Sequence, residues 1–143
     1  MSHASISPRL FFSADDLPSM RRHFVEGERF ADMRESLENF DRAAEQVFLE
    51  SEINFEDQCH HIRRVCDVMQ NMAFWHLMTG HEGARDLAFQ ATRTLMKYPC
   101  WDFFLSDGKV LGVQGAPRGA IAMASVLDWL GDLVDANERK EWL

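Results

Sequence analysis

Cysteine and tyrosine are scarce in this 143-residue chain, which has three cysteines and one tyrosine. Three cysteines are an odd number and too few for a disulfide framework at this length, so reduced, buried thiols are the simplest interpretation. Long apolar runs are missing too: no stretch approaches a membrane span, and residues 1–8 lack the basic and apolar regions of a signal peptide. We therefore expect a cytoplasmic protein with no membrane partner.

Basic residues are also fewer than acidic residues. Lys and Arg number 15 against 23 Asp and Glu, which gives a formal net charge of -8. Binding to nucleic acid or to an anionic membrane needs a positive surface that displaces counterions, so we expect no nucleic-acid partner, although a local basic patch is compatible with this total. With 46% hydrophobic residues, the chain is long enough for one compact domain, which we place at 1–143.

The alternating pattern of β-strands is absent, whereas apolar residues recur at helical spacing of three and four. The sequence therefore predicts an all-α fold of paired helices. Gly80 is expected to end one helix in the left-handed conformation and Glu82 to start the next, which makes a helical hairpin. The expected helices are 13–24 with Ser13 as cap, 28–49, 55–78, 82–97 and 117–130.

Each long helix has an expected buried face. The helix 55–78 is apolar over most of its circumference, so we expect neighbouring helices to cover it on several sides. The inward positions are Phe30, Met33, Leu37, Phe40, Ala44 and Val47 in 28–49; Ile62, Val65, Cys66, Met69, Met72, Ala73 and Leu77 in 55–78; Ala84, Leu87, Ala88, Ala91 and Leu95 in 82–97; and Ile121, Ala124, Leu127 and Leu130 in 117–130.

Two segments are expected to be irregular. Residues 1–12 form an extended arm, because Pro8 disfavours helix before it and the apolar residues 10–12 need to be covered. Residues 98–117 form a loop rich in aromatic residues and glycine, and long loops in compact domains are often functional.

The last residues predict a helix that has only begun. Asp135 and Glu138 have the spacing of a capping box, in which Glu138 would reach back to the amide of the cap. Trp142 and Leu143 follow at once and are expected to be exposed. The chain thus looks like the opening part of a larger protein.

A metal site is the alternative interpretation of Cys59-His60-His61 with Cys66, since both residue types bind zinc. Cys59 and Cys66, however, are seven residues apart on the apolar stripe of the helix. Buried free cysteine behaves as a small hydrophobic side chain, so core packing is favoured and no metal or cofactor is expected.

Three stretches in this order resemble the N-terminal region of heparinase II/III-like and oligoalginate-lyase-like polysaccharide lyases. They are Ser7-Pro8-Arg9-Leu10-Phe11-Phe12-Ser13-Ala14-Asp15-Asp16-Leu17, Leu77-Met78-Thr79-Gly80-His81-Glu82, and Ala122 to Leu130, which ends Val126-Leu127-Asp128-Trp129-Leu130. The resemblance covers nearly the whole chain, although none of the three stretches is diagnostic alone.

The resemblance implies an α/α toroid of helical hairpins, of which this chain would supply the first, incomplete part, followed by further hairpins and a β-sandwich. It implies β-elimination on a uronic-acid-containing polysaccharide or oligosaccharide, of the alginate or glycosaminoglycan type. The catalytic Asn or His and Tyr of such lyases lie beyond the matching stretch. We therefore expect no catalytic residue here and no turnover by this chain alone.

The tyrosine and histidine residues of the chain also indicate that it has no catalytic residue. Tyr98 is the single tyrosine, beside a proline at a helix end, where packing at the edge of the core is favoured over a role as catalytic acid. His61 and His76 are the best-placed candidate bases. A hydrogen-bonded structural role is favoured for both, because the sequence shows no acid paired with them.

Substrate binding is expected at the long loop instead. Gln114 has the chemistry to hydrogen-bond sugar hydroxyls, Arg118 to pair with a uronate carboxylate, and Trp101 to stack on a sugar ring. Each has a structural alternative: Trp101 belongs to a local hydrophobic cluster with the neighbouring phenylalanines, and Arg118 pairs with a nearby acid. The other functions that we consider are a self-contained helical interaction module and a non-catalytic carbohydrate-binding fragment.

Overall fold

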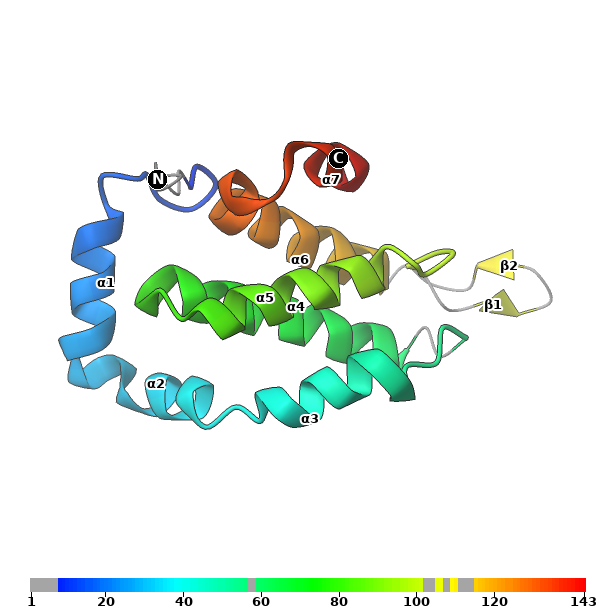
Figure 1. The fold of residues 1–143 in the computed structure, drawn as a ribbon, viewed down its shortest axis with the longest axis horizontal. Coiled ribbons are helices and arrows are strands. Elements are labelled where there is room, and N and C mark those ends of the chain that lie inside the picture. The colour runs from blue at the N-terminus through cyan, green and yellow to red at the C-terminus, as the bar shows by residue number, and fades with distance from the viewer. Residues whose placement is uncertain (1–7, 57–58, 102–104, 107–108, 111–114) are drawn as a thin grey trace.

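The computed structural model describes residues 8–56, 59–101, 105–106, 109–110 and 115–143, and of 105–106, 109–110 and 115 only the backbone. Helices dominate, as predicted (Figure 1). In chain order they are α1 (Leu17–Glu26), the 3-10 turn η1 (Glu28–Phe30), α2 (Ala31–Glu38), α3 (Arg42–Val47), the π-helical turn η2 (Phe48–Glu52), α4 (His60–Thr79), α5 (Glu82–Leu95), α6 (Gly115–Leu130), the 3-10 turn η3 (Gly131–Leu133) and α7 (Ala136–Trp142).

The α4–α5 hairpin is the centre of the fold. Gly80 ends α4 with a φ of 75°, the left-handed conformation that glycine adopts at low cost, and its amide donates to the carbonyl of His76. All seven positions predicted to face inward on α4 are buried, and so are all five on α5. Helix α4 contacts α1, α2, α5 and α6, so the expectation that neighbours cover it on several sides is confirmed.

Helix α6 packs on α4, but it presents a different face from the one predicted. Ile121 is 55% exposed and Ala124 is also exposed, while Ala122, Met123 and Val126 are buried. Apolar residues occupy most positions of this segment, so their spacing is compatible with more than one buried face. The buried face of α6, which contacts α4 and α5, carries Ala122, Met123, Val126 and Leu130. Of these only Leu130 was predicted to face inward.

The single helix predicted for 28–49 is wrong. It breaks at residues 39–41 into α2 and α3, and Asp41 caps α3 by accepting a hydrogen bond from the amide of Ala44 at 3.0 Å. The Arg42 guanidinium donates to carbonyl oxygens at the end of α2. Three positions predicted to face inward are exposed instead: Met33 at 48%, Val47 at 51%, and Ala44.

The N-terminal arm lies against the end of α6. The carboxylate of Asp128 accepts hydrogen bonds from the consecutive amides of Arg9 and Leu10, at 2.7 and 3.1 Å. The arm is less covered than predicted, since Leu10 is 58% and Phe11 70% exposed. The Phe11 ring lies 6.4 Å from that of Trp129, which joins the arm to α6.

Helix α1 begins later than predicted. The Ser13 hydroxyl does not cap the helix; the amide and hydroxyl of Ser13 both donate to the Asp16 carboxylate, and the helix starts at Leu17. A serine placed three residues before an aspartate has two ways to pair, and here the carboxylate closes a turn ahead of the helix.

Helix α7 begins at the predicted cap, because Asp135 accepts from the amides of Asn137 and Glu138. Two other expectations for it are wrong. Glu138 does not reach back to the cap but forms a two-pronged ion pair with Arg93 of α5, and Trp142 is only 6% exposed. Leu143 is exposed, as expected. Helix α7 therefore packs on α5 through Glu138 and Trp142.

The loop predicted at 98–117 is partly regular. Strands β1 (Leu105–Ser106) and β2 (Lys109–Val110) pair antiparallel, with Leu105 opposite Val110, and α6 begins at Gly115. Figure 1 shows this hairpin at one end of the molecule, beyond the ends of α4 and α5.

The helices α1, α2 and α3 follow one another around one side of the α4–α5 hairpin, and α6 and α7 lie on the other side (Figure 1). The all-α class is thus confirmed apart from the short strand pair. The toroid stays a prediction of the resemblance.

Candidate functional site

Two of the three predicted substrate-binding residues lie at the start of α6. The ring of Trp101, which follows α5, rests on Gly119 so closely that a Cβ there would lie 2.7 Å from its Cε3 atom. Arg118 precedes this glycine in α6. The indole N–H donates to the carbonyl of Leu95 at the end of α5, at 3.3 Å. The half-buried indole thus lies against α6 at the residue that follows Arg118.

The Arg118 guanidinium already has an acidic partner. Its Nη2 pairs with Oδ1 of Asp67 on α4, and both side chains are about two-fifths exposed. Its Nε is buried and has no hydrogen-bond partner among the described residues. The structural alternative for Arg118, a pair with a nearby acid, is thus present. Because the pair is open to solvent, a second carboxylate can still approach the remaining N–H groups.

The third predicted residue, Gln114, lies outside the described residues, as do Asp102, Phe103 and Phe104 of the loop. The site at the start of α6 is therefore built from what Trp101, Arg118 and Asp67 provide. Asp67 carries no signal in the sequence that separates it from other surface acids. Only the packing of α6 on α4 places it opposite Arg118.

Tyr98 is a residue of the core edge. It is 5% exposed, its hydroxyl donates to the carbonyl of Asn54 at 3.4 Å, and its ring lies 5.0 Å from that of Phe55. His61 has a similar role, since its Nδ1 accepts from the amide of Asn54 at 2.9 Å and its ring lies edge-on to Phe48. Both contacts tie the segment before α4 to the helices.

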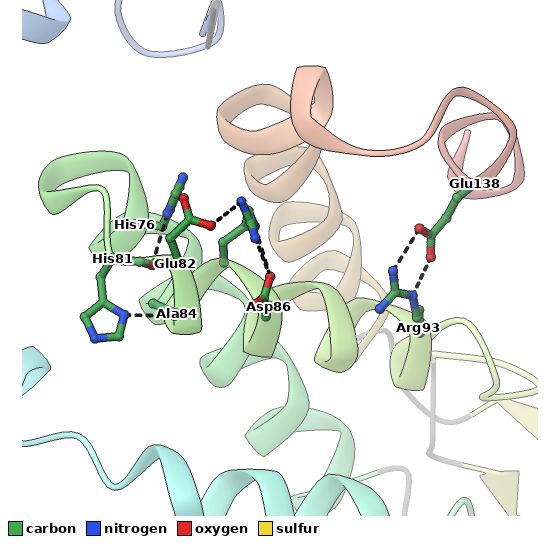
Figure 2. A network of polar contacts seen from close by, with 8 residues as sticks. His76, His81, Glu82, Ala84, Asp86, Arg93 and Glu138 are labelled. Atoms are coloured by element: carbon green, nitrogen blue, oxygen red, sulfur yellow. Dashed lines mark hydrogen bonds and ion pairs between the residues drawn. The ribbon is translucent and has the colours of Figure 1, made fainter. Parts of the chain in front are cut away.

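His76 is the most buried candidate base, at 6% exposure. Its Nδ1 is 3.0 Å from the carbonyl oxygen of His81, across the turn of the hairpin (Figure 2). The carbonyl can only accept, so Nδ1 carries the proton. Burial lowers the pKa of His76, and the positive charges of Arg85 and Arg21 lower it further. It is a neutral, structural histidine of the hairpin.

The stability of the fold should consequently decrease in mild acid. Because the folded-state pKa of His76 is below its ordinary value of 6.5, the unfolded chain binds more protons as pH falls from 6.5 to the folded pKa. We expect His76→Asn, which keeps a donor near Nδ1 but does not titrate, to flatten this decrease. Urea unfolding at several pH values measures it. Equal slopes for wild type and His76→Asn would contradict the assignment.

The segment with metal-ligand residues folds as part of α4. Cys66 is buried, and this burial raises the pKa of its thiol to about 12, although Arg118 partly offsets the effect. A thiol with such a pKa stays protonated at neutral pH, whereas metal binding needs the thiolate. Among the described residues no group of three His, Cys, Asp or Glu side chains is arranged to hold a metal ion.

The structure also reveals a groove that the sequence did not predict. It lies between α1, the η1–α2 segment and the end of α4, and has a volume of about 660 Å³. We name it the α1/α4 groove. Its apolar walls come from Met20, Phe24, Phe30, Met33, Phe74 and Met78.

The three stretches that carry the family resemblance have structural roles here. The arm and the end of α6 bind each other through Asp128, and the stretch around Gly80 forms the turn of the central hairpin. Thr79 reinforces that turn, since its hydroxyl donates to the carbonyl of Trp75. These stretches therefore bear on the fold rather than on chemistry at a site.

Among the residues that the structure describes, no helix combines the length and the apolar character that crossing a membrane requires. Comparison of the chain with known protein families, with curated proteins and with solved structures finds no match.

Proposed function

We propose that this chain is the N-terminal helical portion of a polysaccharide lyase and contributes a subsite for acidic sugars at the start of α6. The observation that carries the proposal is the packing of Trp101 on Gly119, the residue that follows Arg118 in α6. An aromatic ring offers a flat apolar face to a sugar, and the planar fork of arginine matches a uronate carboxylate. The family resemblance supplies the reaction, β-elimination at the uronic acid.

In this proposal Asp67 controls access to the guanidinium. Its carboxylate neutralises Arg118 in the free chain, and a uronate must compete with it or add to the other N–H groups. Subsite affinity should therefore be weak in the wild-type chain. The exposure of both side chains keeps the pair weak as well, since ion pairs in contact with water contribute little.

Binding of an alginate oligosaccharide, measured by calorimetry at low salt, tests the subsite. We expect Arg118→Gln to weaken binding about tenfold, the size of one charge-assisted hydrogen bond, and Asp67→Asn to strengthen it. The matched control is Arg139→Gln, because Arg139 forms an ion pair with Asp132 of similar exposure. Equal effects of Arg118→Gln and Arg139→Gln, or no binding by the wild type, would overturn the subsite.

Turnover is a separate measurement. Incubation of the chain with alginate, heparin or hyaluronan, followed by absorbance of the new unsaturated bond, should give no product, because Tyr98 and His76 are buried in structural contacts. Product formation would contradict the prediction that catalysis needs residues outside this chain. Binding without product also fits the carbohydrate-binding alternative. Product formation by a protein in which further hairpins extend this chain would exclude that alternative.

A further inference from the structure

The α1/α4 groove has a fixed floor and adaptable walls. Phe24 is 3% exposed and lies edge-on to Phe74 with ring centroids 5.4 Å apart. Phe30, at 6.0 Å from Phe24, closes one end. Three of the walls are methionines, whose unbranched side chains adjust to ligands of irregular shape. Such a lining excludes water and attracts a hydrocarbon chain.

The groove has two polar side chains, and one of them is a guanidinium. They are the side chains of His23 and Arg29, and none of the described residues that line the groove is acidic. This is unusual in a chain with 23 acidic residues and a net charge of -8. The Arg29 guanidinium lies 5.9 Å from the centre of the Phe30 ring, and none of the ion pairs found among the described residues includes it. The groove thus places a cation that has no ion-pair partner among the described residues beside an apolar wall.

The size of the groove favours a small molecule over a helix of a partner protein. Its volume of about 660 Å³ falls in the range of about 300–1,000 Å³ that is usual for small-ligand sites. The lining covers residues 20–27 of the α1 segment, which corresponds to about 10 Å of helix axis. A docking helix with anchors at i, i+3, i+4 and i+7 spans about the same length, so the volume of the groove, and not its length, favours a small molecule.

We propose that the α1/α4 groove binds a single-chain amphiphile with a carboxylate head group, the tail against the phenylalanines and methionines and the head at Arg29. This inference is independent of the acidic-sugar subsite, because the two regions share no residue. The nature of the ligand follows from the lining: apolar walls select a hydrocarbon tail, and the cationic rim selects an anionic head.

Calorimetric titration of the whole chain with sodium decanoate, below its micelle concentration, is the test. Decanoate should bind at one site, and decanol and decyltrimethylammonium should bind at least about tenfold more weakly, as expected for one charged contact. Arg29→Gln should weaken decanoate about tenfold without affecting decanol. The matched control, Arg22→Gln, removes the same charge from an exposed position on α1 outside the groove and should change little.

The tail is tested separately. Met33 is 48% exposed, so Met33→Gln should leave the fold intact while weakening decanoate and decanol alike; Met96→Gln, at a position 40% exposed outside the groove, is its control. Equal binding of all three probes, or equal effects of Arg29→Gln and Arg22→Gln, would overturn the choice of an anionic ligand. If decanoate fails to bind and an acidic amphipathic peptide binds instead, the groove is a protein-docking site and the amphiphile proposal is wrong.

Discussion

Replacing Trp142 with alanine should lower the free energy of unfolding by about 3 kcal/mol, although this residue is next to the end of the printed sequence. The indole is 6% exposed and lies edge-on to Phe89 of α5, with ring centroids 5.8 Å apart. Removing a buried tryptophan typically costs about 3–5 kcal/mol. We expect the lower limit here, because α7 can detach locally without unfolding the remaining helices. Urea unfolding followed by far-UV circular dichroism measures the change.

The neighbouring residue is the control for this prediction. Leu143 is 85% exposed, so Leu143→Ala should change the unfolding free energy by no more than about 0.5 kcal/mol. Hydrogen exchange adds a local measurement: in Trp142→Ala the amides of α7 should lose protection while those of α4 keep it. If both substitutions have the same small effect, α7 does not pack on α5 in solution.

Trp142 shows where interpretation of the sequence stops. The cap at Asp135 follows from neighbouring residues and was predicted, since a carboxylate two or three residues before free amides accepts their hydrogen bonds wherever it occurs. The partner of Glu138, by contrast, is Arg93, 45 residues earlier in the chain. Local spacing cannot show that this ion pair and Phe89 hold the tryptophan against α5.

The same distinction separates the helices that were predicted from those that were not. The faces of α4 and α5 follow from dense apolar stripes and from Gly80, all of them local signals. The break between α2 and α3 depends on Asp41 and Arg42 pairing with backbone groups. In the sequence, helix propensity and a continuous apolar pattern predict one helix here. The hydrogen bonds of Asp41 and Arg42 that end α2 and start α3 are visible only in the folded chain.

At the candidate site, sequence reasoning found Trp101 and Arg118 but not their relation. Gly119 lets the indole approach α6, and a glycine inside an apolar helix is a signal of close approach that could have been used. Asp67 and the α1/α4 groove depend on which helices pack together. Of the groove walls, Phe30 and Met33 were predicted to face the core, and the groove itself lies at the bend between α1 and α2 (Figure 1).

Helix α1 is held to the hairpin mainly by aromatic contacts. Phe24 meets Phe74 at 5.4 Å, Trp75 at 6.1 Å and Phe30 at 6.0 Å between ring centroids. The first two pairs are edge-on and the third is tilted, and aromatic pairs of this kind contribute about 0.5–1.5 kcal/mol each beyond the burial of their area. The Arg21 guanidinium adds a hydrogen bond to the carbonyl of Leu77 at 2.7 Å. Phe24 is therefore the residue on which the attachment of α1 depends most.

Phe24→Ala should lower the unfolding free energy by about 4 kcal/mol, because it leaves a cavity among three aromatic rings as well as losing their contact. Urea unfolding measures it, and Val25→Ala, at the next position of the helix and 52% exposed, should change stability by no more than about 0.5 kcal/mol. Hydrogen exchange should show α1 losing protection before α4 and α5, since the hairpin keeps its own buried stripe. A loss below about 1 kcal/mol, similar to that of Val25→Ala, would mean that α1 is not fixed to the hairpin through this cluster, and the groove would then have no stable wall for a ligand.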